Sequence, residues 1–324
     1  MAAFAQSERL RPAALRPGDK VGIIAPAGPI DADALEAGTA WLIRKGFEPF
    51  YLPSILDREL YFAGSAQRRL DEFHEMFSRS DIKAIICARG GYGCNYLLPR
   101  IDLELVRANP KIFCGCSDVT TLLTYLCDAA GVVTFHGPML NVDVRSDGVD
   151  EASWAGALMS GEPYTREFAT DEVQTLVSGS AEGTLYGGCL SLLCASLDTP
   201  YEIETLDTIL FIEDVAEPPF RIDRMLMQLK MAGKLAEVRG IIFGEMLKCG
   251  PRDNGDYTLQ QVVQRVFGDL GVPVAYGLRS GHVSRNNFTL PLGVRVAFNA
   301  GATVSLSFAA SVQNTAEAVS SSKS

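Results

Sequence analysis

The chain has 324 residues, of which 47% are hydrophobic and 21% charged, and its formal net charge is −10. This composition is typical of a soluble globular enzyme with two domains or one large α/β unit. An acidic chain without a basic run longer than two residues argues against nucleic acid or an anionic membrane as a partner. No apolar run reaches the roughly 18 residues of a membrane span.

The cysteines indicate a reducing compartment rather than disulfides or zinc. The chain has eight cysteines but no C-x-x-C pair, and only three histidines. Most of the cysteines lie in apolar runs, which is typical of buried thiols. Residues 1–19 lack the apolar core of a signal peptide. We therefore expect a cytoplasmic protein that holds no metal.

The first half of the chain alternates short apolar runs with segments of helical periodicity. The predicted strands are 21–25, 47–52, 83–88, 111–116 and 132–135. The predicted helices are 31–45, 65–78 and 118–127. Such alternation predicts an α/β fold with an N-terminal parallel sheet and helices on both faces. Ligands of such sheets bind beyond the carboxyl ends of the strands.

The second half predicts another α/β domain, richer in strands and barrel-like. The expected division is an N-terminal domain at 15–145, a linker at 146–182, a C-terminal domain at 183–310 and a disordered tail at 311–324. A short helix near 152–159 is predicted within the linker. The C-terminal domain should hold helices at 187–196, 221–232 and 258–267, and strands at 208–212, 238–243, 288–297 and 303–308.

Ser117 lies where the strand at 111–116 runs directly into the helix at 118–127. A serine at the apex of a strand–turn–helix is how a nucleophile elbow exposes its hydroxyl. The tight connection also predicts a strained backbone at Ser117. The alternative is that Ser117 caps the helix, since serine favours that position.

A serine nucleophile needs a base, and histidine is the usual one at neutral pH. His74 lies on an amphipathic helix, which favours a structural role. His136 follows a strand and precedes Gly-Pro, so it could reach the site or fix a turn. His282 lies in a polar loop directly after Gly281, and this placement favours it as the base.

The group that orients the base is expected at Glu213, the first acidic residue after five positions without charge. It would emerge at the carboxyl end of its strand, although a solvated strand end would look the same. Gly90 and Gly91 directly follow the strand at 83–88, and one of their N–H groups with that of Asp118 could form an oxyanion hole. Their short glycine pattern lacks the Lys-Ser/Thr of a P-loop, so no nucleotide cofactor is predicted.

Several motifs in order resemble those of one family. They are Pro17-Gly-Asp-Lys-Val-Gly-Ile-Ile-Ala-Pro26, Ala88-Arg-Gly-Gly-Tyr-Gly93, Gly115-Cys-Ser-Asp-Val-Thr120, His136-Gly-Pro138, Tyr186-Gly-Gly-Cys-Leu-Ser-Leu-Leu193, Phe211-Ile-Glu-Asp214, Ile222-Asp-Arg224, Gly281-His282 and Leu290-Pro-Leu-Gly293. From about Leu15 to Phe308 the chain resembles the LD-carboxypeptidases, also called muramoyltetrapeptide carboxypeptidases, together with the related microcin C self-immunity peptidases.

The resemblance implies a serine carboxypeptidase that needs no cofactor and releases the terminal D-alanine of murein tetrapeptides during cell-wall recycling. It places the nucleophile on Ser117, the acid on Glu213, the base on His282 and the oxyanion donors on the backbone of Gly91 and Asp118. We also expect the chain to form a homodimer. Its other partner should be a small peptide substrate.

One departure from the family pattern is Cys189, where asparagine is expected after Gly-Gly, and this change could alter packing at the domain junction.

Two other functions remain open from the sequence. One is a hydrolase of peptidyl- or aminoacyl-nucleotides, as in microcin C immunity, which would need an apolar shelf for the base. The other is a non-catalytic binding protein of two α/β domains. If the side chains of Ser117 and His282 lie beyond hydrogen-bond distance of each other, the binding protein is favoured.

Overall fold

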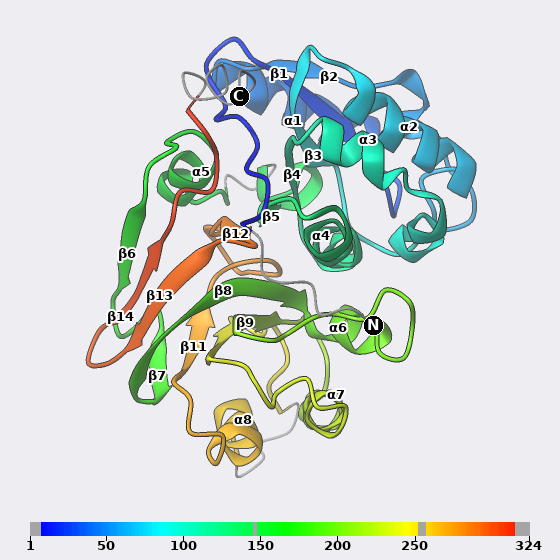
Figure 1. The fold of residues 1–324 in the computed structure, drawn as a ribbon. Helices are drawn as coiled ribbons and strands as arrows, with labels where there is room; N and C mark the ends of the chain where they lie inside the picture. Colours follow the sequence, from blue (N-terminus) through cyan, green and yellow to red (C-terminus); the bar gives the residue numbers. More distant parts are fainter. Residues whose placement is uncertain (1–7, 145–147, 252–256, 315–324) are drawn as a thin grey trace.

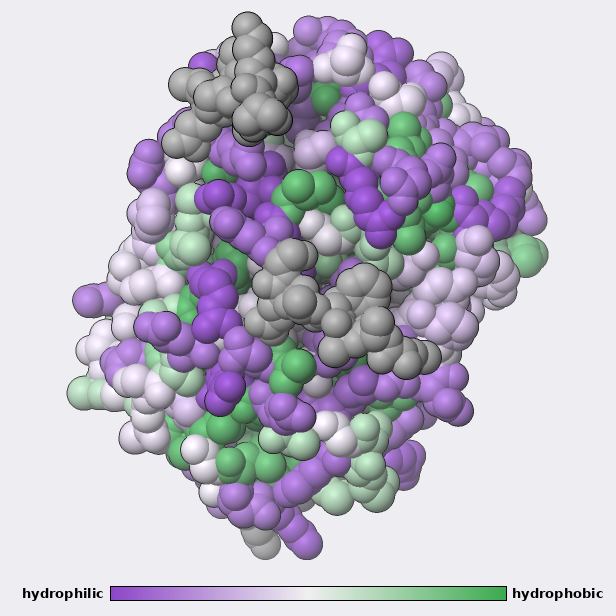
Figure 2. All heavy atoms as spheres, in the orientation of Figure 1, coloured by the Kyte–Doolittle hydropathy of each residue, from purple (hydrophilic) through white to green (hydrophobic). Residues whose placement is uncertain are grey.

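The computed structural model describes residues 8–144, 148–251 and 257–314. The chain forms two α/β domains, each built on one sheet (Figure 1). Hydrophilic side chains cover most of the face drawn in Figure 2, and apolar ones gather there only in small groups. In the described part of the chain, no helix is long and apolar enough to cross a membrane.

The first sheet has six strands in the order β12-β5-β4-β3-β1-β2. The strands from the first half of the chain are parallel, as predicted, and comprise β1 (Lys20–Ile24), β2 (Glu48–Phe50), β3 (Ile82–Cys87), β4 (Ile112–Gly115) and β5 (Thr134–His136). Their carboxyl ends share one edge of the sheet.

Helices cover both faces of this sheet, because alternate residues of its strands are apolar on either side. Ala84 and Ile86 of β3 face α1 (Ala32–Arg44), whereas Ile85 and Cys87 belong to the core that holds α2 (Ala66–Ser78). Further helical segments include α3 (Leu103–Ala108), α4 (Thr120–Tyr125) and a π-helical turn at Leu126–Ala130. Asp31 and Ser65 cap α1 and α2 with their side chains, which explains where these helices begin.

The second sheet has eight strands in the order β6-β14-β13-β8-β9-β10-β11-β7. They are β6 (Tyr164–Phe168), β7 (Gln174–Val177), β8 (Gly179–Cys189), β9 (Thr208–Glu213), β10 (Gly240–Gly244), β11 (Val274–Leu278), β13 (Arg295–Ala300) and β14 (Val304–Phe308). The helices of this domain are α6 (Leu190–Ala195), α7 (Pro219–Met231) and α8 (Leu259–Phe267).

The eight-stranded sheet curls toward a barrel. The Thr175 hydroxyl of β7 donates to the Gly301 carbonyl in the turn between β13 and β14, at a distance of 2.8 Å. Strands β8 to β11 are parallel, so Glu213, Gly244 and Leu278 all lie at their carboxyl ends.

The segment 146–182 was expected to be a linker, but it contributes to the fold. The short helix predicted there is α5 (Glu151–Leu158). The linker expectation is wrong for the rest, because β6, β7 and the start of β8 belong to the second sheet. Their short, charged or glycine-rich sequences hid them from a search for apolar runs.

The strand predicted at 288–297 divides between the two sheets. Its first part, β12 (Leu290–Leu292), pairs antiparallel with β5 of the first sheet, and Leu290 lies opposite His136. Its second part continues as β13 of the second sheet. Figure 1 shows β12 between the two domains. The chain therefore returns to the first sheet after most of the second sheet has been built.

The described start of the predicted tail is ordered. Ser311 and Val312 are buried, and the Ser311 hydroxyl donates to the Ala157 carbonyl. Gln313 forms a β-bridge with Ala13, in which its N–H donates to the Pro12 carbonyl and its carbonyl accepts from the Ala14 N–H. The expectation of a tail from 311 is wrong for 311–314, and residues 315–324 lie outside the described part.

Position 187 of β8 requires glycine, because the backbone of the neighbouring strand β9 approaches it closely near the domain junction. Its φ is +124°, and a Cβ built there would lie 2.0 Å from the Phe211 carbonyl oxygen. We expect Gly187→Ala to lower the free energy of unfolding by about 3 kcal/mol or more. Gly250→Ala is the matched control, because a Cβ at Gly250 meets open space. Equal denaturation midpoints for the two variants would contradict this account.

Candidate active site

Ser117 lies at the sharp turn between β4 and α4, and its backbone is in a sparsely populated conformation. Its φ is +62°, in the left-handed region that non-glycine residues rarely adopt. The predicted backbone strain at Ser117 is confirmed. Ser117 begins a 3-10 turn (Ser117–Val119) whose N-cap is Cys116, and the N-cap of α4 is Val119; neither makes a side-chain cap bond. The helix-cap interpretation of Ser117 is therefore wrong.

Glycine at position 90 leaves the space that Ser117 occupies. A Cβ at Gly90 would lie 2.7 Å from the Ser117 Cβ and 2.8 Å from its Oγ. Such contacts are closer than real side chains allow, so the loop after β3 can border the hydroxyl only without a side chain. The sequence motif at 90–93 therefore reflects a close approach to Ser117.

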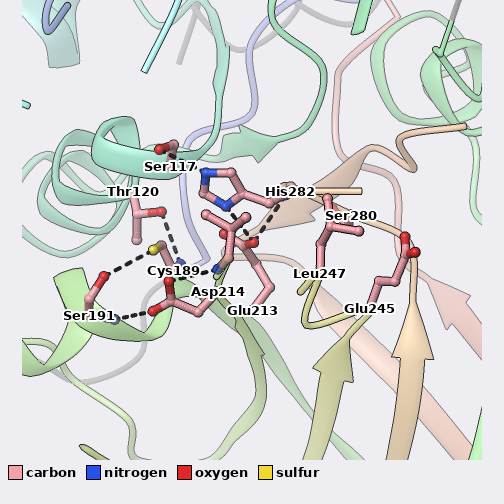
Figure 3. A network of polar contacts seen from close by, with 12 residues as sticks. Ser117, Thr120, Cys189, Ser191, Glu213, Asp214, Glu245, Leu247, Ser280 and His282 are labelled. Carbon is pink, nitrogen blue, oxygen red and sulfur yellow. Dashed lines mark hydrogen bonds and ion pairs between the residues drawn. The ribbon is translucent and has the colours of Figure 1, made fainter. Parts of the chain in front are cut away.

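Three side chains from distant parts of the sequence form one hydrogen-bonded row (Figure 3). His282 Nε2 lies 3.0 Å from Ser117 Oγ, and His282 Nδ1 lies 2.8 Å from Glu213 Oε2. The His282 backbone N–H also donates to Glu213 Oε2, at 3.0 Å. The structure thus brings together the serine, the histidine and the carboxylate that the sequence singled out.

The surroundings of Glu213 and His282 shift the pKa values of these two groups in opposite directions. Burial opposes ionisation of Glu213, but the positive charge of His282 and contacts with His136 and His282 lower the pKa of this carboxyl to about 2. Burial also disfavours protonated His282, yet the charge and hydrogen bond of Glu213 raise the pKa of the imidazole above its usual value. Glu213 is therefore an anion that stabilises a proton on His282.

His136, the other base considered from the sequence, lies on the far side of Glu213. It is fully buried, and its Nδ1 lies 3.0 Å from Ser280 Oγ. Its Nε2 is 3.7 Å from Glu213 Oε1, beyond hydrogen-bond distance but within reach of an ion pair. His136 thus flanks the acid, whereas His282 contacts the serine. His74 lies elsewhere, and its Nε2 accepts from the Asp102 N–H.

The loop that carries His282 is fixed by an asparagine that the sequence analysis did not single out. Asn287 is fully buried, and its amide accepts from the Gly281 N–H and donates to the Gly281 carbonyl, both at 3.0 Å. Gly281 has a φ of +89°, and a Cβ there would lie 2.6 Å from Glu213 Cδ. The only sequence signal for Asn287 was its place in the same polar loop.

Of the expected oxyanion donors, Asp118 directly follows Ser117, and Gly91 directly follows Gly90, which borders the Ser117 side chain. The Asp118 side chain accepts from the Cys94 N–H at 2.8 Å. This bond ties the loop that follows β3 to the turn at Ser117. The role of the two backbone N–H groups stays a prediction.

Figure 3 shows Asp214 and Cys189 next to Glu213. Asp214 accepts from the Ser191 N–H at 2.9 Å and from the Val215 N–H at 2.8 Å, so it is bound to backbone rather than to His282. Cys189 lies opposite Glu213 in the β8–β9 register, and its N–H donates to Thr120 Oγ1. The departure at Cys189 therefore falls at the domain junction, beside the row.

Cys189, Glu213 and His282 are also the described residues whose donor atoms cluster tightly enough, within 4.8 Å, to suggest a metal site. Both ring nitrogens of His282 already face partners. Burial raises the pKa of the Cys189 thiol well above its usual value, which disfavours the thiolate that metals bind. The local chemistry fits a proton-transfer row better than a metal centre.

The arrangement can carry out acyl transfer. A hydroxyl on a sharp turn, an imidazole that can take its proton and a buried carboxylate behind the imidazole are the parts of a serine hydrolase. The serine comes from one domain, and the other two groups come from the second. The fold and this site define the class of a two-domain α/β hydrolase.

Comparisons with known proteins agree with this class. Residues 21–137 match the model of the LD-carboxypeptidase N-terminal domain, and residues 182–298 match that of the LD-carboxypeptidase C-terminal domain. The chain belongs to the LD-carboxypeptidase family. The family resemblance inferred from the sequence is confirmed.

Individual relatives cover nearly the whole chain. A probable murein peptide carboxypeptidase of Bacillus subtilis is 40% identical over 294 residues, which are 89% of this chain and 91% of that protein. The crystal structure of muramoyltetrapeptide carboxypeptidase from Oxalobacter formigenes is 30% identical, with a TM-score of 0.80 over 91% of this chain and 100% of that one. The microcin C7 self-immunity protein MccF is 26% identical, with a TM-score of 0.83 over 93% and 98%.

The pKa of His282 tests the electrostatics of the row. We expect NMR titration to place it above the usual histidine value of about 6.5 in the natural protein. In Glu213→Gln the carboxylate charge is lost while burial and the charges of Asp214 and Asp143 remain, so the pKa of His282 should fall. His74 serves as an internal control, and its titration should not change between the two proteins. An unchanged pKa of His282 in Glu213→Gln would refute the coupling.

Proposed function

We propose that this protein is a serine carboxypeptidase that cleaves the bond between an L-centre and a terminal D-amino acid, with murein tetrapeptides as its substrates. The observation that carries the proposal is the position of His282, which lies within hydrogen-bond distance of both Ser117 Oγ and Glu213 Oε2. The substrate class follows from the relatives named as murein peptide and muramoyltetrapeptide carboxypeptidases.

The reaction begins when Ser117 Oγ attacks the carbonyl carbon of the scissile bond. His282 Nε2 takes the serine proton, and Glu213 stabilises the imidazolium that forms. The backbone N–H groups of Gly91 and Asp118 bind the oxyanion of the tetrahedral intermediate. His282 then gives its proton to the departing amine, and D-alanine leaves. A water molecule, activated by the same imidazole, hydrolyses the acyl-enzyme and restores Ser117.

For the compartment and the oligomeric state, we propose what the sequence indicates. The eight cysteines are free and buried, which fits a reducing compartment such as the cytoplasm. We expect a homodimer, which light scattering on the purified protein would measure.

A second candidate is hydrolysis of peptidyl- or aminoacyl-nucleotides. Its support is the likeness to MccF, one structure of which is described as a complex with aspartyl sulfamoyl adenosine, with a TM-score of 0.82. A non-catalytic binding protein is disfavoured, because Ser117 and His282 lie within hydrogen-bond distance.

The substrate is tested by incubating the protein with murein tetrapeptide and with an aspartyl sulfamoyl adenosine in parallel, followed by mass spectrometry. We expect release of D-alanine from the tetrapeptide, and its loss in Ser117→Ala and His282→Ala. His136→Ala should act mainly on folding or on substrate binding. Cleavage of the nucleotide alone would favour the second candidate, and turnover by Ser117→Ala at the natural rate would overturn the mechanism.

The role of Glu213 is tested against its neighbour. Glu213→Gln keeps the shape but removes the charge that stabilises the imidazolium, so kcat should fall by about three to four orders of magnitude. Asp214→Asn should be far milder, because Asp214 is bound to the backbone of Ser191 and Val215. Circular dichroism would show whether both variants are folded. Comparable losses in the two variants would mean that the wrong carboxylate has been assigned.

A further inference from the structure

Three side chains beside the nucleophile carry the atoms that a zinc ion prefers as ligands. The sulfur of Cys189, a carboxylate oxygen of Glu213 and a ring nitrogen of His282 all lie within 4.8 Å of one another (Figure 3). Three atoms so close always leave a point within about 2.8 Å of each, whereas zinc lies about 2.0–2.3 Å from such ligands. Shifts of about half an ångström therefore bring all three atoms onto one ion.

The sheet fixes two of these donors side by side. Cys189 ends β8 and Glu213 ends β9, and the two residues lie opposite each other in the parallel register. Residues at such positions of neighbouring strands project from the same face of the sheet. Cys189 and Glu213 are 3% and 0% exposed, whereas the His282 side chain is 23% exposed. An ion from solvent therefore reaches the buried sulfur and carboxylate past His282.

The carboxylate of Glu213 has accepting capacity that the row of three side chains does not use. Its Oε2 faces the ring and the backbone N–H of His282. Its Oε1 is buried and makes no hydrogen bond to the described residues. The sulfur of Cys189 has one polar contact among these residues, with Ser191 Oγ at 3.3 Å, which is weak for a thiol. Both groups therefore gain a partner when a cation binds between them.

We propose that Cys189, Glu213 and His282 form an inhibitory site for a thiophilic divalent cation, of which Zn²⁺ is the type. The ion is no part of the catalytic reaction, because it occupies the place of the protons that the reaction moves. The row described above is the state of the protein without the ion, in which the thiol keeps its proton. The inhibition rests on the proposed function, whereas the binding of the ion does not.

Coordination through His282 Nδ1 explains why the ion inhibits. Nδ1 faces Glu213, and Nε2 faces Ser117 Oγ. When Nδ1 binds the ion, a neutral imidazole must carry its single proton on Nε2. Nε2 then has no lone pair to accept the serine proton, so Ser117 stays a hydroxyl and acyl transfer stops.

The charges and protons of the bound state balance. The two positive charges of the ion meet the carboxylate of Glu213 and the thiolate of Cys189, and His282 stays neutral. Starting from the neutral imidazole, one proton, that of the thiol, leaves to solvent. The buried cluster then has no net charge, which avoids the cost of burying an uncompensated ion.

The donor set selects the class of cation. Sulfur and imidazole ligands favour zinc and softer ions, whereas Mg²⁺ and Ca²⁺ prefer sites made of oxygen alone. Cys189 supplies the sulfur, and it stands where asparagine is expected from the family pattern. An amide forms no thiolate, so Cys189→Asn should remove the preference for thiophilic ions.

The test measures the rate at buffered free Zn²⁺ or Mg²⁺, and each variant is compared with its own rate without metal. We expect Zn²⁺ to inhibit the natural protein, EDTA to reverse the inhibition, and Mg²⁺ to have no effect. Cys189→Asn and Cys189→Ser should raise the inhibition constant for Zn²⁺ about a hundredfold or more. Cys194→Ala is the matched control, because this thiol contacts the Met225 carbonyl outside the cluster. Its response to Zn²⁺ should be that of the natural protein.

Binding measured without turnover separates this proposal from the proposed function. Co²⁺ serves as the probe, because a bound thiolate adds a charge-transfer absorption band to its spectrum. We expect this band in the natural protein and in Ser117→Ala and Cys194→Ala, but not in Cys189→Asn or Cys189→Ser.

Each outcome decides between the two proposals. If the natural protein cleaves neither candidate substrate but shows the thiolate band only with Cys189 present, the proposed function fails and the metal site stands. The metal site is overturned if the natural protein is not inhibited by Zn²⁺ while it cleaves its substrate. It is also overturned if inhibition is equal in the folded Cys189 variants, or if the natural protein shows no thiolate band.

Discussion

The site depends on one buried negative charge. Glu213 is fully buried, and a lone carboxylate in such a place would be severely destabilising. His282 compensates it with a ring nitrogen and its own backbone N–H. Gly244 and Gly281 provide the room, because a Cβ at either position would lie 2.6 Å from an atom of the Glu213 side chain. The charge thus fixes the histidine, and the histidine fixes the geometry at Ser117.

The contacts that surround the buried charge of Glu213 also join the two domains. Strand β5 of the first sheet ends at His136, which lies 3.7 Å from Glu213 of the second sheet. The hydroxyl of Ser280, two residues before His282, contacts the imidazole of His136. Cys189 of β8 donates to Thr120, three residues after Ser117. The row of three side chains is therefore braced on both sides by contacts that cross the junction.

The sequence predicted the features that depend on local pattern. Ser117 and Glu213 both follow buried apolar runs, and a polar residue at that point of a parallel strand emerges at the functional edge of the sheet. His282 was marked by its glycine-flanked polar loop. By contrast, β8 was missed because four glycines weaken its apolar pattern, and β6 because polar and charged residues fill its middle between Tyr164 and Phe168.

Contacts between distant segments could not be predicted in this way. Asn287 binds Gly281, and Phe62 lies against Gly93, but neither pair leaves a trace in periodicity or composition. The division of 288–297 between two sheets is of the same kind, since both halves look like ordinary strand. Which sheet each half joins is decided by packing that involves residues more than a hundred positions away.

The place of β12 has a consequence for how the protein is made. Until residues 290–292 leave the ribosome, β5 is an edge strand with unpaired backbone groups on the side that β12 later covers. The first domain therefore emerges as an unfinished sheet and must wait for about 150 further residues before its edge is closed. A nascent or truncated chain that ends before β12 would expose this edge to other chains, so its hazard is aggregation rather than mere loss of activity.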